Sequence, residues 1–527
     1  MKNSKIRIIS NHYRVAIVIS IISLGVIFSG TIVLLSYLNE NNNNDNNHNS
    51  SNNSVGEAFE GYNLFVLQYK SQHNESRSLT LFITDMEGKV IVEKKYQKEP
   101  RGLDVYPVEL FNTTTVLLGD DDGAVLWNFV TNSTLDLGFS GHHDLEYNAN
   151  NNSFFTMSWY SSETPDVSDG YERDGYDWIK EYDWHGNLKW SLNTQQFINL
   201  SMWCPHQDSY GKTRDITHGN TVFYDSKEDV IYYLSRNTNT FFKIDHKTKE
   251  ILWSLGEYGD FQLIDQYGKT RENLFFHAHS VEKIDTNTFI LFDNDRHNQT
   301  NPENYRSRIV EITIDEASMT AYESWEWAAP VEYYSDIWGD ADRLPNGNRL
   351  GTFGTQTHPN TDIGPRLVEV NDSKHILWEM NFPTTADYMY GIYRMERFRL
   401  TPTIENLTEI FTPVDSVNVS WQTWYNFRTK HPVEGFYEIY LDGQLIKNGV
   451  HVFKKWWLPS NLMMTLKNLS PGEHNVTAVI ADEKGSMISD TVEIHIETTF
   501  IKFRPYQVFF ELNPIQQKTH SNKIWAF

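Results

Sequence analysis

The feature that most constrains the fold is a hairpin pattern that recurs from about residue 60 to about residue 400. Each copy combines an alternating apolar strand, a turn led by Asp or Asn, and a second strand that usually carries a Trp. The clearest copies are 182–192, 242–255 and 368–380. Short alternating runs without a sustained 3.6-residue period are typical of strands, so the pattern predicts an all-β domain.

The spacing of the copies predicts how the strands are grouped. The hairpins recur at intervals close to the length of one four-stranded unit, and about six copies fit between residues 60 and 400. We therefore expect a six-bladed β-propeller over 60–400.

Polar residues mark the strand that precedes each hairpin. Four successive repeats place them about ten positions before an apolar strand, beginning at His142, Thr217, His277 and Gly339. Three of these repeats carry His at the same position, namely His143, His218 and His279. Because the innermost strands of a propeller line a central channel, we expect the three side chains to meet there. A single His in a strand is more often a hydrogen-bonded packing residue, and this interpretation stays open for each one.

Neighbouring residues extend the predicted site. Since side chains two residues apart share a face of a strand, Asn220 should lie beside His218, and His277 could join His279. Adjacent residues of a strand point to opposite faces, so the side chain of His142 should point away from His143. Arg236 ends the next strand, where its guanidinium suits an oxyanion; pairing with one of the many carboxylates is the alternative.

These residues resemble the core motif of the arylsulfate sulfotransferases. The family pattern of His-x-Asn, an acidic turn, a strand and Ser-Arg is matched between Asp215 and Gly256 by His218, Asn220, Ser235 and Arg236. A second motif, a His followed by Phe-Asp-Asn, is matched by His279 and 292–294. Further matching segments are His142–Asp144, Arg308 and Leu344–Asn348.

The resemblance implies an enzyme that moves a sulfuryl group from an aryl sulfate to a phenol, without a nucleotide sulfate or other cofactor. It implies that His279 is transiently sulfurylated, so that the kinetics are ping-pong. His218, Asn220 and Arg236 would hold the sulfuryl oxygens. His143 would protonate the leaving phenoxide, and His142 and His277 are further candidates for substrate binding.

Two departures from the family pattern limit these expectations. A Gln is expected before the nucleophile, but this chain has His277-Ala-His279, which raises the alternative of a metal site completed by His218 or His143. The predicted sandwich domain also follows the propeller instead of preceding it. A non-catalytic adhesion propeller is a further alternative. A lone Cys204 argues against a quinone-dependent dehydrogenase of the kind that uses a vicinal cysteine pair.

Charge and the flanking segments complete the prediction. The net charge of -24 argues against nucleic acid or an anionic membrane surface as the main partner, and no protein partner is indicated. The uncharged apolar run 15–38 predicts a transmembrane helix after the basic N-terminus 1–14. A low-complexity tether over 39–59 would follow, and the rest of a single-pass cell-membrane protein would lie outside the cytoplasm.

A different strand pattern begins after the propeller. Residues 405–498 alternate strongly between turns rich in Gly, Asp and Pro, which predicts an immunoglobulin-like or fibronectin III-like β-sandwich. The tail 499–527 has no clear repeat, and no structure is predicted for it.

Overall fold

The structure, a computed structural model, shows an all-β chain, as predicted. It describes residues 57–71, 77–96, 106–112, 114–120, 123–148, 150–164, 170–204, 211–297, 305–354, 364–382, 388–408, 416–496 and 523–526. Helical structure in these residues is limited to the three-residue 3₁₀ turns η1 (Thr194–Gln196), η2 (Leu200–Met202), η3 (Arg236–Thr238) and η5 (Val331–Tyr333). The chain divides into two compact units, one ending at Phe398 and the other beginning at Arg399.

The first unit contains, within the described residues, six sheets of four or more strands. Three of them are β27-β1-β2-β3 (Tyr388–Phe398, Tyr62–Ser71, Arg77–Thr84, Val90–Lys95), β4-β5-β6-β7 (Tyr106–Asn112, Thr115–Asp120, Gly123–Asn128, Ser133–Asp136) and β8-β9-β10-β11 (His142–Asn148, Ser153–Glu163, Arg173–Asp183, Leu188–Asn193), with β12 (Thr213–Asp215) paired to β10. The others are β13-β14-β15-β16 (Gly219–Asp225, Val230–Ser235, Thr240–Asp245, Ile251–Gly256), β19-β20-β21-β22-β17-β18 (His279–Lys283, Thr288–Asp293, Arg308–Asp315, Thr320–Ala328, Gln262–Ile264, Thr270–Arg271) and β23-β24-β25-β26 (Asp340–Arg343, Arg349–Phe353, Arg366–Val370, Ile376–Asn381).

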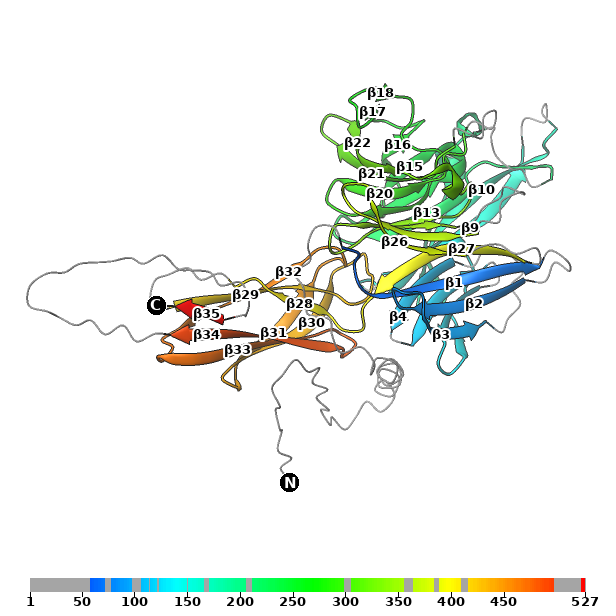
Figure 1. Cartoon of the computed structure of the whole chain (residues 1–527). Helices are drawn as coiled ribbons and strands as arrows, with labels where there is room; N and C mark the ends of the chain where they lie inside the picture. The colour runs from blue at the N-terminus through cyan, green and yellow to red at the C-terminus, as the bar shows by residue number, and fades with distance from the viewer. Residues whose placement is uncertain are drawn as a thin grey trace, which may run out of the picture. The chain divides into compact units, whose positions relative to one another are not determined.

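These sheets follow one another in a closed order. The first strand of each sheet contacts the first strand of the next, in the order β4, β8, β13, β19, β23, β27 and back to β4. Strand β27, from the end of the unit, pairs antiparallel with β1, from its beginning, so the two ends of the unit share one sheet (Figure 1). Equivalent positions of the six first strands therefore lie around one ring although they are far apart in sequence.

The recurring Trp joins neighbouring sheets. In four consecutive sheets the indole Nε1 donates to the next sheet's second hairpin or, at the end of the cycle, to the turn after β2. The pairs are Trp190 to the His246 carbonyl (2.7 Å), Trp253 to Glu316 Oε1 (3.0 Å), Trp325 to the Asp372 carbonyl (3.1 Å) and Trp378 to the Met86 carbonyl (2.6 Å). A buried indole needs such a partner, so this repeated hydrogen bond explains the spacing of Trp in the sequence.

Four of the six first strands share a second feature, a break in register near their beginning. Pairing shifts between Tyr106 and Glu109, between His142 and Leu145, between Gly219 and Thr221, and between His279 and Glu282. Left-handed backbone accompanies three of these shifts: φ is 60° at His143, 43° at His218 and 51° at Ser280. Bulges redirect side chains and cost backbone strain, and both are common beside functional sites.

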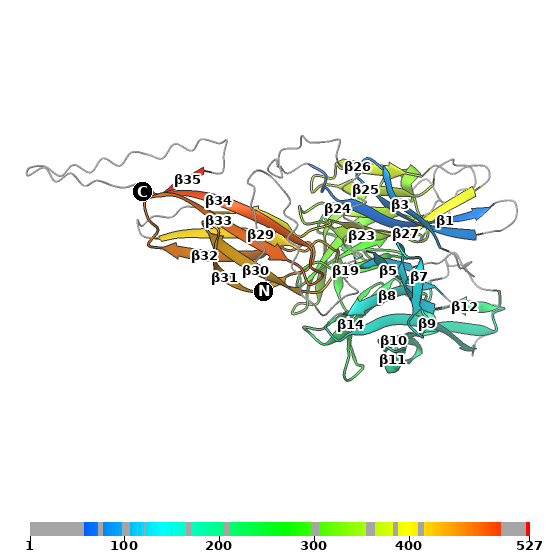
Figure 2. The same ribbon diagram turned by 90° about the horizontal axis from the view of Figure 1, so that it is seen from below.

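The second unit has two sheets within the described residues. One has the order β28-β29-β32 (Thr403–Asn406, Ser416–Trp424, Ser460–Lys467), and the other β31-β30-β33-β34-β35 (Gln444–Phe453, Val433–Leu441, Gly472–Ala481, Met487–Ile496, Lys523–Ala526) (Figure 2). Alternate residues of β29 are buried, among them Val419 and Trp421, as expected for strands with one face on a core.

The prediction that the chain is a single-pass membrane protein is wrong, because the structure contradicts it. No helix in the described part of the chain has the length and apolar character needed to cross a bilayer, because its helical segments are three-residue turns. Residues 15–38, on which the prediction depended, lie outside the described residues, as do the tether 39–56 and most of the tail.

The ion pair that closes the first unit gives a test of the fold. Arg397 of β27 donates to Glu369 of β25 and to Asn63 Oδ1 of β1 at 2.9 Å, and both members of the ion pair are fully buried. We expect Arg397→Met to lower the free energy of unfolding by about 3–5 kcal/mol, because Glu369 would keep an unpaired buried charge.

Urea denaturation followed by Trp fluorescence measures this loss. The matched control is Arg271→Met, because Arg271 is half exposed and its partner Asp265 keeps the backbone donors of Tyr267 and Lys269. That change should cost less than about 1 kcal/mol. Equal losses in the two variants would contradict a closing role for Arg397.

Candidate active site

The best-defined member of the site is His279, at the start of β19. Its Nδ1 lies 2.6 Å from Asn294 Oδ1. The Nδ2 of Asn294 donates to the carbonyls of Ser335 (2.8 Å) and Trp338 (2.7 Å), which uses both amide hydrogens. The amide oxygen must therefore face the imidazole, so a neutral His279 carries its proton on Nδ1 and leaves the Nε2 lone pair available.

The electrostatic surroundings keep His279 neutral. Burial, followed by the positive charge of Arg236, holds the pKa of His279 well below the usual value of 6.5, and the hydrogen bond to Asn294 opposes this shift only in part. Charges on His218 and Arg394 lower the pKa of His279 further. The result is a neutral imidazole surrounded by cationic groups, a combination that suits attack on an anionic substrate.

Two arginines supply this positive charge. Arg236 opens η3 and donates to Asn237 Oδ1 (3.1 Å) and to the carbonyl of Asp336 (3.3 Å). Arg394 lies on β27 and donates from Nη1 to Asp144 Oδ1 at 2.6 Å, while its Nε is buried without a hydrogen-bond partner. Arg394 is thus a second candidate for binding an anion.

His218 and His143 lie together beside His279. The two rings have centroids 4.5 Å apart, and His218 Nδ1 is 2.5 Å from Asp215 Oδ2. That bond directs Nε2 of His218 away from the carboxylate, as in other histidines oriented by an acid. Burial and the neighbouring charges of His218 and His142 hold the pKa of His143 well below 6.5. At neutral pH, His143 is therefore uncharged.

His142 belongs to a buried hydrogen-bond network centred on Asp177. Its Nε2 is 2.7 Å from Asp177 Oδ1, and Oδ2 accepts from Thr217 Oγ1, the Gly219 amide and Tyr233 OH, each at 2.7 Å. Burial opposes ionisation of Asp177, but the charge of His142 and these hydrogen bonds bring its pKa below the usual value. The network fixes the segment that carries His218.

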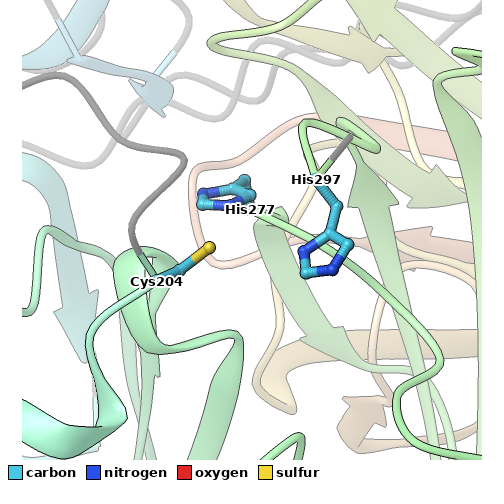
Figure 3. A group of neighbouring side chains, drawn as sticks. All are labelled: Cys204, His277 and His297. Carbon is cyan, nitrogen blue, oxygen red and sulfur yellow. The ribbon is translucent and has the colours of Figure 1, made fainter. Parts of the chain in front are cut away.

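Asn220 and His277 have other neighbours than the sequence suggested. Asn220 is fully buried, and its Nδ2 donates to the carbonyl of Ala278 at 2.9 Å, directly beside His279. His277 precedes β19 and has a φ of 57°, so the two-residue alternation that paired it with His279 does not apply. Its side chain lies with Cys204 and His297 (Figure 3).

Sequence reasoning missed three residues of this site, Tyr393, Arg394 and Trp338, and it included Asn294 only as part of a matching motif, without a role. The Tyr393 ring lies 6.3 Å from that of His143, 6.2 Å from that of His279 and 5.9 Å from that of Trp338. Tyr393 and Arg394 lie on β27, which the repeat pattern does not include. A closed ring needs a strand from the end of the repeats to complete its first sheet. That need for closure could have pointed to the segment that carries Tyr393 and Arg394.

Comparison with known proteins decides the family. The family model described as arylsulfotransferase (ASST) matches residues 50–394, which is well over half of the chain. The chain belongs to the arylsulfotransferase family. The resemblance read from the motifs is confirmed, and family membership indicates a sulfotransferase acting on small aryl substrates. No curated protein matches the chain in sequence.

The solved structures to which the arylsulfotransferase chain is similar include two distant likenesses. The periplasmic gluconolactonase PpgL of Pseudomonas aeruginosa is 10% identical with a TM-score of 0.32, covering 63% of this chain and 100% of its own. The dihydro-haem d1 dehydrogenase NirN is 9% identical with a TM-score of 0.30, covering 77% and 75%. Likenesses this weak carry no argument about function.

The proton position on His279 can be tested directly. In the protein labelled with ¹⁵N-histidine, we expect His279 to carry its proton on Nδ1 and to show no titration near 6.5, because its pKa is lowered. In Asn294→Ala the tautomer should no longer be fixed. A proton on Nε2 in the unaltered protein, or protonation of His279 near pH 6.5, would contradict the assignment.

Proposed function

We propose that this arylsulfotransferase moves a sulfuryl group from an aryl sulfate to a phenol in two steps, with His279 as the group that is transiently sulfurylated. The observation that carries the proposal is the hydrogen bond from His279 Nδ1 to an Asn294 amide whose own donors are both used. It leaves Nε2 as the nucleophilic atom, beside two arginines suited to an anion.

In the first step, Nε2 of His279 attacks the sulfur of the aryl sulfate. The new N–S bond forms as the bond between sulfur and the aryl oxygen breaks, and the electron pair leaves with the phenoxide. We assign to Arg236 and Arg394, whose charges act on His279, the binding of the sulfuryl oxygens while negative charge redistributes. In this proposal His218, whose Nδ1 is held by Asp215, donates a proton from Nε2 to the phenoxide.

In the second step, the hydroxyl oxygen of the acceptor phenol attacks the same sulfur. His218 Nε2 accepts the phenol proton, and the N–S electron pair returns to His279, so the proton is ready for the next donor. His143 fits the proton-donor role less well than expected, because its lowered pKa leaves it uncharged. We assign it a hydrogen bond to the substrate instead.

The proposed site also favours transfer over hydrolysis. Only 2% of His279 is exposed, so little water reaches its ring. The aromatic rings of Tyr393 and Trp338 offer a surface for the aryl groups of donor and acceptor. Asn220 acts in this proposal by holding the backbone next to His279, and His142 by holding Asp177.

For the architecture, we propose a six-bladed propeller over 60–400 and an immunoglobulin-like sandwich over 405–498. The closed order of the six sheets and the shared sheet of β1 and β27 support the propeller. Two sheets with alternately buried residues support the sandwich, for which we propose the role of a spacer.

Steady-state assays test the transfer. With a nitrophenyl sulfate as donor and an excess of phenol, we expect the unaltered protein to release nitrophenol and His279→Asn to lose roughly 10⁴-fold or more in kcat. The exposed His185, changed to Gln, is the matched control and should leave the rate unchanged. Release of nitrophenol by His279→Asn at the control rate would contradict the proposed nucleophile.

The pH dependence follows from the lowered pKa of His279. Only the neutral imidazole attacks, and protonation removes it, so activity should be lost as pH falls through the folded-state pKa. Because that pKa is lowered, the acid limb of kcat/KM for the nitrophenyl sulfate should lie below pH 6.5. A pH–rate profile measures this, and an acid limb at or above 6.5 would contradict the surroundings assigned to His279.

A further inference from the structure

A group of possible metal ligands includes His277, two residues before His279. The ligand atoms of Cys204, His277 and His297 all lie within 4.8 Å of one another (Figure 3). It is the one group of three or more such residues at this spacing in the described part of the chain. None of the three has a role in the proposed sulfuryl transfer.

The three residues come from separate segments that their backbones hold in place. Cys204 follows η2, and its amide donates to the carbonyl of Asn237 at 2.9 Å. The amide of His277 donates to Asn239 Oδ1 at 2.9 Å. His297 follows β20, and its ring stacks on Phe276 with centroids 3.9 Å apart. The convergence is therefore built into the fold and does not depend on one flexible side chain.

We propose that Cys204, His277 and His297 bind a Zn²⁺ ion. A thiolate and two imidazoles are a donor set that zinc prefers, whereas hard cations such as Mg²⁺ select oxygen ligands. Zinc bonds of about 2.3 Å to sulfur and about 2.0 Å to nitrogen place tetrahedral ligand atoms about 3.5 Å apart. Side-chain movements of about 1 Å or less would shorten the spacing between the three ligand atoms to that distance. A fourth position stays open for water or another small ligand.

The ion would join the segments that carry the proposed chemistry. His277 is two residues from His279, and the partner of Cys204 is Asn237, next to Arg236. The site differs from the metal alternative drawn from the sequence, because Cys204 and His297 join His277 in place of His279 and of His218 or His143. An ion here leaves the anion-binding groups unoccupied, so metal binding and sulfuryl transfer are compatible.

Cobalt binding tests the proposal without reference to activity. The full chain, purified without a polyhistidine tag and stripped of metal, is titrated with Co²⁺, whose bond to a thiolate gives a near-ultraviolet charge-transfer band. We expect the band to saturate at one ion per chain, Zn²⁺ to abolish it, and Mg²⁺ to leave it unchanged. Since Cys204 is the only cysteine, the band reports this site alone.

Variants separate a three-ligand site from a lone thiol. Cys204→Ser should lose the band completely, and His297→Gln should weaken Co²⁺ binding at least about tenfold, whereas the exposed His185→Gln should bind as the unaltered protein does. Zn²⁺ should also raise the thermal unfolding midpoint of the unaltered chain but not of Cys204→Ser. Absence of the band in the unaltered chain, or equal affinity in His297→Gln, would overturn the proposal. Each result is independent of the sulfuryl-transfer assays.

Discussion

The site depends on closure of the ring of sheets. Strand β27 pairs with β1 across more than three hundred residues of chain, and Arg397 links this shared sheet to Glu369 of the preceding one. Without closure, β27 would not bring Tyr393 and Arg394 to the histidines of β8 and β19. The hydrogen bonds of the recurring Trp also link neighbouring sheets. The bond from Trp378 links the last sheet to the sheet that contains β1 and β27. A local defect at this boundary should therefore affect the distant histidines.

Within that ring, neutral and acidic side chains set the orientation of each histidine. Asn294 fixes His279, Asp215 fixes His218, and Asp177 fixes His142. Asp144 joins three sheets, because its carboxylate accepts from Val222 of β13 and Arg394 of β27 while it lies on β8 itself. Such partners hold reacting groups in one geometry and one tautomer, which a set of histidines alone would not do.

Much of the strand arrangement could be predicted because alternation, turn residues and Trp spacing are local properties of the sequence. The meeting of His143 with His218 followed from equivalent positions in the repeats. The contribution of β27 could not be predicted, because its pairing partner is far away in the chain and its segment lacks the hairpin pattern. His277 was misplaced because left-handed backbone at that residue breaks the alternation from which its direction was inferred. Cys204 was considered only for the vicinal cysteine pair that a lone cysteine cannot form.

The central claim is that His279 carries the sulfuryl group between donor and acceptor. Mass spectrometry of the protein, quenched after mixing with aryl sulfate in the absence of a phenol, tests it most directly. We predict a sulfuryl group on His279 that appears with the first release of aryl product and disappears when phenol is added. Release of product with no modified residue, or with the group on a residue other than His279, would contradict the account.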